Sequence, residues 1–168
     1  MTVVPESALR GRLGGVSRGL DLSAGWDGQC LTGRIGSFVT GQDLRMEVVE
    51  DGLRGRLGGV ITGWDVRAGV QAGELHLHLG GVTDGVDARL AFTPGSVVGR
   101  YGGFTRGLDI HLRHYGDEVR GRFGGYTDGT DLRMILGETP LLLGVVLAVS
   151  ALRVWQEQEA AAQTAPRR

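Results

Sequence analysis

The chain has 168 residues, and its 18 basic and 19 acidic side chains give a net charge of −1. This balance argues against a dedicated nucleic-acid-binding protein, which carries a basic excess on one face. The lone Cys30 excludes a disulfide framework and a thiolate metal cage, and it predicts a buried structural thiol. Residues 1–7 contain neither a basic segment nor an apolar run of a secretory signal, so we expect a cytoplasmic protein.

A 22-residue repeat organises most of the chain. After an N-terminal arm, residues 1–8, six copies of the repeat follow over residues 9–137 without insertion or deletion. A first glycine register holds Gly14, Gly36, Gly58, Gly80, Gly102 and Gly124; a second holds Gly19, Gly41, Gly63, Gly85, Gly107 and Gly129; an aspartate register holds Asp21, Asp43, Asp65, Asp87, Asp109 and Asp131. Such a period predicts that each copy is one supersecondary unit packed on the next.

Each repeat contains two runs in which apolar and polar residues alternate. In the third copy, Leu53, Gly55 and Leu57 alternate with Arg54 and Arg56, and a second alternating run covers residues 65–70. A period of two with one apolar face is typical of half-buried strands. The six repeats therefore predict twelve strands.

Turn residues separate these runs, both inside the repeats and between them. A short element such as Thr83-Asp84-Gly85 lies inside each repeat, with the second-register glycine where a left-handed residue would close a hairpin. Pairs such as Asp51-Gly52 join one repeat to the next. Tight turns throughout predict an antiparallel meander, and twelve strands must close to avoid exposed edges.

The C-terminal segment predicts a helix inside this barrel. Leu141 to Val154 is apolar on all sides of a helix, so we expect a central helix over about 140–156, followed by a polar tail, 157–168. Glycines such as Gly55 and Gly121 face inward and are expected to strip the wall of side chains and make room for this helix. The expected fold is mainly β: six hairpin repeats form a closed 12-stranded antiparallel barrel around a hydrophobic C-terminal helix, as a single domain over residues 9–156.

This arrangement of six two-stranded units followed by the apolar segment Leu141 to Val154 resembles the tubby-like barrel. That barrel is shared by the tubby C-terminal domain, the phospholipid scramblases and the LURP-one-related proteins. The resemblance covers residues 9 to about 156 and is one of layout. It implies association with membrane lipid, either as phosphoinositide binding or in a scramblase-like role.

Two other architectures compete with the closed barrel. A parallel β-solenoid suits a 22-residue rung, but it would stack the aspartates in one ladder and the arginines in another, about 4.8 Å apart, with repulsion of about 1 kcal/mol per contact even in water. An outer-membrane barrel shows the same alternation turned inside out. The antiparallel meander instead places arginine and aspartate on neighbouring strands, where they neutralise each other.

Two metal sites are conceivable from the sequence. Asp84 and Asp128 resemble the second acid of a calcium-binding glycine-aspartate repeat, although turn capping explains them better. His76, His78 and His111 are zinc-ligand types, but His78 and His111 stand in registers that other repeats fill with arginine. We therefore expect no metal and no cofactor.

The residues do not assemble into a nucleophile, base and orienter, so we expect a non-enzymatic binding or structural module. Trp26, Trp64 and Tyr101 are expected to pack in the core or at the barrel rim. The candidate contacts to phosphate groups of an anionic membrane lipid are repeated outward arginines: Arg12, Arg34, Arg56, Arg100 and Arg122. These predict a cytoplasmic module that associates peripherally with the membrane; the alternative is a β-solenoid scaffold or surface-assembly protein.

Overall fold

The computed structural model describes residues 8–15, 17–37, 40–59, 61, 63–80, 85–103, 107–125 and 129–164. In this part of the chain there are twelve strands and one helix. The strands are β1 (Leu9–Gly14), β2 (Gly19–Trp26), β3 (Cys30–Ile35), β4 (Gln42–Val49), β5 (Gly52–Leu57), β6 (Trp64–Gln71), β7 (Glu74–Leu79), β8 (Val86–Thr93), β9 (Ser96–Tyr101), β10 (Leu108–Tyr115), β11 (Glu118–Phe123) and β12 (Thr130–Ile135). The helix is α1 (Leu141–Thr164).

The strands form one closed antiparallel barrel, which confirms the predicted fold class. Each strand pairs with its neighbours in sequence, and β1 pairs with β12 to close the ring. A solenoid is ruled out, because its strands would pair in parallel between repeats. The wall also has an apolar inner face and a charged outer face, which is the reverse of the parity of a lipid-facing barrel.

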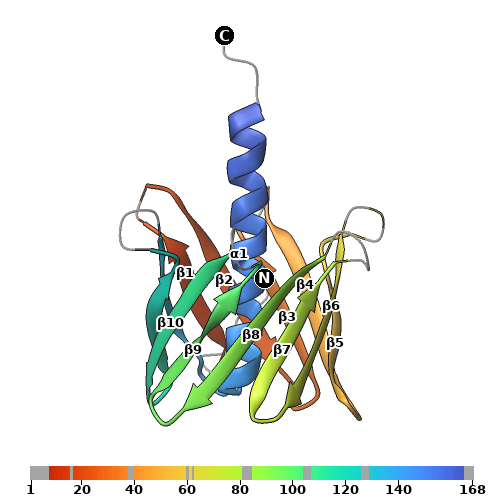
Figure 1. The fold of residues 1–168 in the computed structure, drawn as a ribbon. Coiled ribbons are helices and arrows are strands. Elements are labelled where there is room, and N and C mark those ends of the chain that lie inside the picture. The colour runs from red at the N-terminus through yellow and green to blue at the C-terminus, as the bar shows by residue number, and fades with distance from the viewer. Residues whose placement is uncertain are drawn as a thin grey trace.

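Helix α1 passes through the barrel from one end to the other. It starts after β12, at the end that carries the turns between repeats, and Figure 1 shows it projecting beyond the strands at the opposite end. Eleven of its residues between Leu143 and Val154 are buried. The helix continues past residue 156 to Thr164, further than the apolar pattern predicts, because the residues that follow are glutamate, glutamine and alanine, which favour helix.

In the loop inside each repeat, the glycine with the left-handed conformation is not the one that the sequence predicted. The left-handed residue is the first-register glycine, with φ between 86° and 109° at all six positions. The second-register glycine was expected to be left-handed, but Gly19 and Gly41 show no such φ. A Cβ on Gly41 would overlap the carbonyl oxygen of Ser37 and lie 2.9 Å from that of Ile35. This second glycine is therefore required by the close approach of two backbone segments.

The inward glycines make room for the neighbouring strand, which corrects the expectation that they make room for the helix. A Cβ on Gly55 would overlap the carbonyl oxygen of Arg45 and lie 2.7 Å from Cγ of Met46. On Gly121 it would lie 2.6 Å from Cδ2 of Leu112. The large inward side chain of the adjacent strand thus lies over each glycine, and that side chain forms the surface on which the helix packs.

The fourth repeat reverses this size pattern. Leu77 occupies the place of the inward glycine, and its cross-strand partners are the small residues Ala68 and Ala88. Helix α1 approaches β1, β2 and β3 most closely, and a Cβ on its Gly144 would overlap the side chain of Leu136. Because β7 lies across the ring from β1, the extra bulk of Leu77 fills the wider side of the barrel.

Alanine substitution tests the close strand approach. We expect Gly55→Ala to destabilise the protein by about 1–3 kcal/mol, because the new methyl group meets the backbone of β4. The matched control is Gly25→Ala on β2, where a Cβ meets nothing within 4 Å. Urea unfolding measures both variants. Equal stability of the two variants would contradict this account of the inward glycines.

Removal of α1 tests the core. Its seven large buried side chains, Leu143, Val145, Val146, Leu147, Val149, Leu152 and Val154, contribute roughly 10–20 kcal/mol of hydrophobic free energy, at about 1.5–3 kcal/mol each. That exceeds or matches the whole stability of a typical domain, about 5–15 kcal/mol. We expect a chain ending at Glu138 to show no cooperative thermal transition by circular dichroism. A cooperative transition in the truncated chain would show that the barrel does not need the helix.

Candidate functional site

A ring of rim pairs lies on the outer wall near the loops inside the repeats. In each pair, a basic residue of the first strand of a repeat contacts the aspartate directly opposite on the second strand. The pairs are Arg12–Asp21 (2.7 Å), Arg34–Asp43 (2.7 Å), Arg56–Asp65 (2.9 Å), His78–Asp87 (2.6 Å), Arg100–Asp109 (2.7 Å) and Arg122–Asp131 (2.6 Å). The structure therefore places all five sequence-predicted arginines in ion pairs on the barrel surface.

Several of these arginines also hold the adjoining loop. Nε of Arg12 donates to the carbonyl oxygen of Gly15 at 3.0 Å, and Nε of Arg122 donates to that of Gly125 at 3.0 Å. Arg56 donates from both Nε and Nη2 to Gly59. A guanidinium can satisfy a carboxylate and a carbonyl together because its donors form a rigid fork. The rim pairs thus give the five predicted arginines a structural role, and their contact with lipid phosphate stays a prediction.

A second set of outward arginines lies nearer the turns between repeats, and we call it the arginine belt. Its members are Arg10, Arg45, Arg54, Arg67, Arg89 and Arg113. None of the six forms an ion pair or a side-chain hydrogen bond with another residue of the described ranges. Several face like charges across the sheet: Arg54 lies opposite Arg67, and Arg113 lies opposite Arg120. Like charges in directly opposed positions destabilise a sheet.

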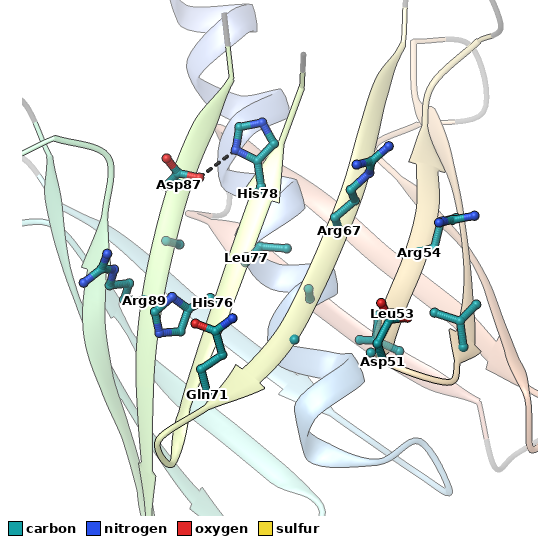
Figure 2. Close-up of a pocket in the computed structure, with 15 residues that line it drawn as sticks. Asp51, Leu53, Arg54, Arg67, Gln71, His76, Leu77, His78, Asp87 and Arg89 are labelled. Atoms are coloured by element: carbon teal, nitrogen blue, oxygen red, sulfur yellow. Dashed lines mark hydrogen bonds and ion pairs between the residues drawn. The ribbon is translucent and has the colours of Figure 1, made fainter. Parts of the chain in front are cut away.

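A groove of about 490 Å³ crosses the outer wall from β5 to β8, within the belt. Figure 2 shows Arg54, Arg67, His76 and Arg89 on four neighbouring strands, with Gln71 extending along the groove toward His76. Two carboxylates also line it. Asp87 is held by Nδ1 of His78 in the rim pair, and Asp51 lies at the lower end, in the turn between β4 and β5. The basic side chains therefore outnumber the acidic ones around the groove.

Gly69 lies at the centre of the groove, at an outward position whose residue type varies from repeat to repeat. The corresponding positions of the other repeats are Gly25, Glu47, Ala91, Arg113 and Ile135. A Cβ on Gly69 would meet only the carbonyl oxygen of Asp51, at the ordinary contact distance of 3.4 Å, so this glycine leaves open space. Sequence reasoning missed the site because it concentrated on positions that obey the repeat. The signal was available where histidine replaces the side chains of other repeats, at His76 and His78.

At the end where the helix leaves the barrel, it is held by polar and aromatic contacts. The guanidinium of Arg153 lies 5.2 Å from the ring centre of Trp64, and the hydroxyl of Tyr101 donates to Oε1 of Gln156 at 2.9 Å. Burial raises the pKa of Tyr101, while the charge of Arg153 opposes that shift. Tyr101 is buried and Trp64 and Trp26 pack against the core, which confirms that these aromatics are packing residues.

The candidate metal ligands do not come together in the part of the chain that the structure describes. There, no three histidine, cysteine, aspartate or glutamate residues form a cluster that could hold an ion. His78 instead replaces arginine in a rim pair, as its register predicts. Asp84 and Asp128, the calcium candidates, lie outside the described residues. Cys30 is half-buried, and the expectation of a buried thiol was therefore wrong.

Helix α1 is long and apolar enough to cross a membrane by length and composition alone. Of its most apolar 18-residue window, 61% is buried inside the protein. The barrel wall therefore covers most of the surface that a bilayer would otherwise cover. Comparisons with protein-family models, with curated proteins and with solved structures found no match to this chain.

A double-mutant cycle on Arg56 and Asp65 tests the rim pairs. Their side chains are 36% and 57% exposed, so we expect a coupling energy below about 1 kcal/mol that falls further at high salt. Denaturant unfolding of the wild type, Arg56→Met, Asp65→Asn and the double variant measures it. A cycle on Asp65 and Arg122, which lie on separate hairpins, is the control, for which we expect a coupling energy of zero. A coupling above about 2 kcal/mol that ignores salt would contradict surface pairing.

Proposed function

We propose that this chain is a non-enzymatic binding module that associates with anionic membrane lipid at the cytoplasmic face. The observation that carries the proposal is the arginine belt, whose six guanidiniums form no ion pair with a carboxylate of the described residues. Arginine presents donors that match a phosphate group in bidentate fashion. Opposed arginines such as Arg54 and Arg67 repel each other, and an anionic surface relieves that repulsion.

The charge distribution determines the character of this binding. The net charge of the chain is −1, so there is no long-range attraction to an anionic surface, and only the local field of the belt acts. Binding is therefore weak, peripheral and sensitive to salt. The closed barrel around a C-terminal helix supports the same proposal through its likeness of layout to the tubby-like barrels, for which lipid association is expected.

Vesicle co-sedimentation tests the proposal. We expect binding to phosphatidylserine-containing vesicles at low salt, with little binding at high salt or to phosphatidylcholine alone. The variant Arg67→Gln/Arg89→Gln removes two belt charges, each worth about 1 kcal/mol near an anionic surface, so its binding falls about 30-fold. The matched control Arg56→Gln/Arg100→Gln removes two arginines of rim pairs and retains binding.

The outcomes separate the competing accounts. If the rim-pair variant loses binding and the belt variant retains it, the sequence-predicted arginines are the contacts and the belt is not. If the wild type binds no vesicle under any condition, the membrane proposal fails and a scaffold role remains. Binding that ignores salt points to insertion of α1 rather than to attraction by the belt. Circular dichroism confirms that each variant is folded.

A further inference from the structure

We propose that the groove over Gly69 is a binding site for a phosphate monoester carried on a hydroxylated compound, such as a sugar or polyol. This inference rests on the proposed function and adds a specific site to it. The belt surrounds much of the barrel, and in the groove three of its residues, Arg54, Arg67 and Arg89, line a hollow of about 490 Å³. That volume lies within the range of small-molecule sites, about 300–1,000 Å³.

The pairing register of the strands places the donors of the site around Gly69. His76 lies directly opposite Gly69 on β7, and Arg89 lies opposite His76 on β8. Arg67 is two residues from Gly69 on β6 and lies opposite Arg54 on β5. These side chains stand on paired strands of a closed wall, so their backbones hold a fixed spacing, while the guanidiniums retain freedom to close on a ligand.

The chemistry of the lining residues distinguishes a phosphate ester from a simple anion. Arg54, Arg67 and Arg89 supply donors for the phosphate oxygens, and none of them is engaged by a carboxylate of the described chain. Asp87 is engaged by His78 at 2.6 Å, which reduces its repulsion of a phosphate at the upper end. At the other end, Asp51 and Gln71 offer oxygen acceptors for hydroxyl groups of the carrier. A groove for inorganic phosphate alone would not need those acceptors.

A valine at position 69 is the discriminating variant. Its Cβ lies over the groove and meets only the carbonyl oxygen of Asp51, at 3.4 Å, and valine has high strand propensity, so we expect Gly69→Val to fold. Gly25→Val is the matched control at the equivalent position of the first repeat, where nothing lies within 4 Å. Both variants leave every arginine of the belt in place.

Two probes distinguish a soluble ligand from a lipid headgroup. Calorimetry with glucose 6-phosphate, with glucose and inorganic phosphate as references, measures soluble binding. Vesicles containing phosphatidylglycerol phosphate, whose headgroup ends in a phosphate monoester, are compared with phosphatidylglycerol vesicles of equal surface charge. For whichever monoester probe the wild type binds, soluble or in the vesicle, we expect Gly69→Val to weaken binding at least tenfold. We expect Gly25→Val to leave that binding unchanged.

The proposal is overturned if neither monoester probe binds more tightly than its reference, or if Gly69→Val binds as the wild type does. Failure of this site is distinguishable from failure of the proposed function, because binding to phosphatidylserine vesicles depends on the belt. If Gly69→Val still binds phosphatidylserine vesicles and no monoester is preferred, the proposal for the groove fails and the proposal for the belt stands. If the wild type binds no vesicles and no monoester, both proposals fail.

Discussion

The structure depends on the limited volume inside a twelve-stranded barrel that also contains a helix. Neighbouring strands approach so closely that one inward position in most repeats has room for no side chain, because the backbone of the next strand lies over it, as the carbonyl oxygen of Arg45 and the side chain of Met46 lie over Gly55. A one-residue slip in strand register would turn every inward residue outward and bury charge. Close packing inside the wall therefore fixes the register, and the register in turn fixes which charges meet on the outside.

The outer surface follows from that register. Basic residues of the first strand of each repeat lie opposite aspartates of the second, and the resulting rim pairs neutralise the charge near the loops. The same register brings Arg54 opposite Arg67 and Arg113 opposite Arg120, although Arg120 also pairs with Glu118 and Arg54 lies opposite Glu47 on its other side. The wall thus divides its arginines into a set engaged by the protein and a set facing solvent. The second set costs some stability, which is the pattern expected where a protein surface serves binding rather than folding.

The sequence predicted most of the fold because the repeat is an unusually direct record of local structure. Alternation gave the strands, glycine-containing turns gave the meander, and a helix with no polar face required an enclosing wall. Other features depend on three-dimensional proximity that a pattern of residue types does not contain. The reason for Gly55 lies in the backbone of β4. The left-handed conformation was expected at Gly63 but occurs at Gly58, because a positive φ and crowding by carbonyl oxygens both favour glycine. The extension of α1 to Thr164 reflects helix propensity, which an apolar pattern does not record.

The candidate site illustrates why a repeat is a poor guide to function. Repetition records the constraints that every hairpin shares, and the positions that obey it, such as Arg12 and Arg34, turned out to be tied to aspartates and loop carbonyls. A particular binding site must break the symmetry, since six equivalent hairpins offer no unique place. The third and fourth repeats do so together: the histidines replace other side chains beside Gly69, and Leu77 with Ala68 and Ala88 rearranges the inner layer behind it. Because inner and outer positions alternate along the same two strands, the packing of Leu77 on Ala68 and the groove that faces solvent lie on opposite faces of β6 and β7.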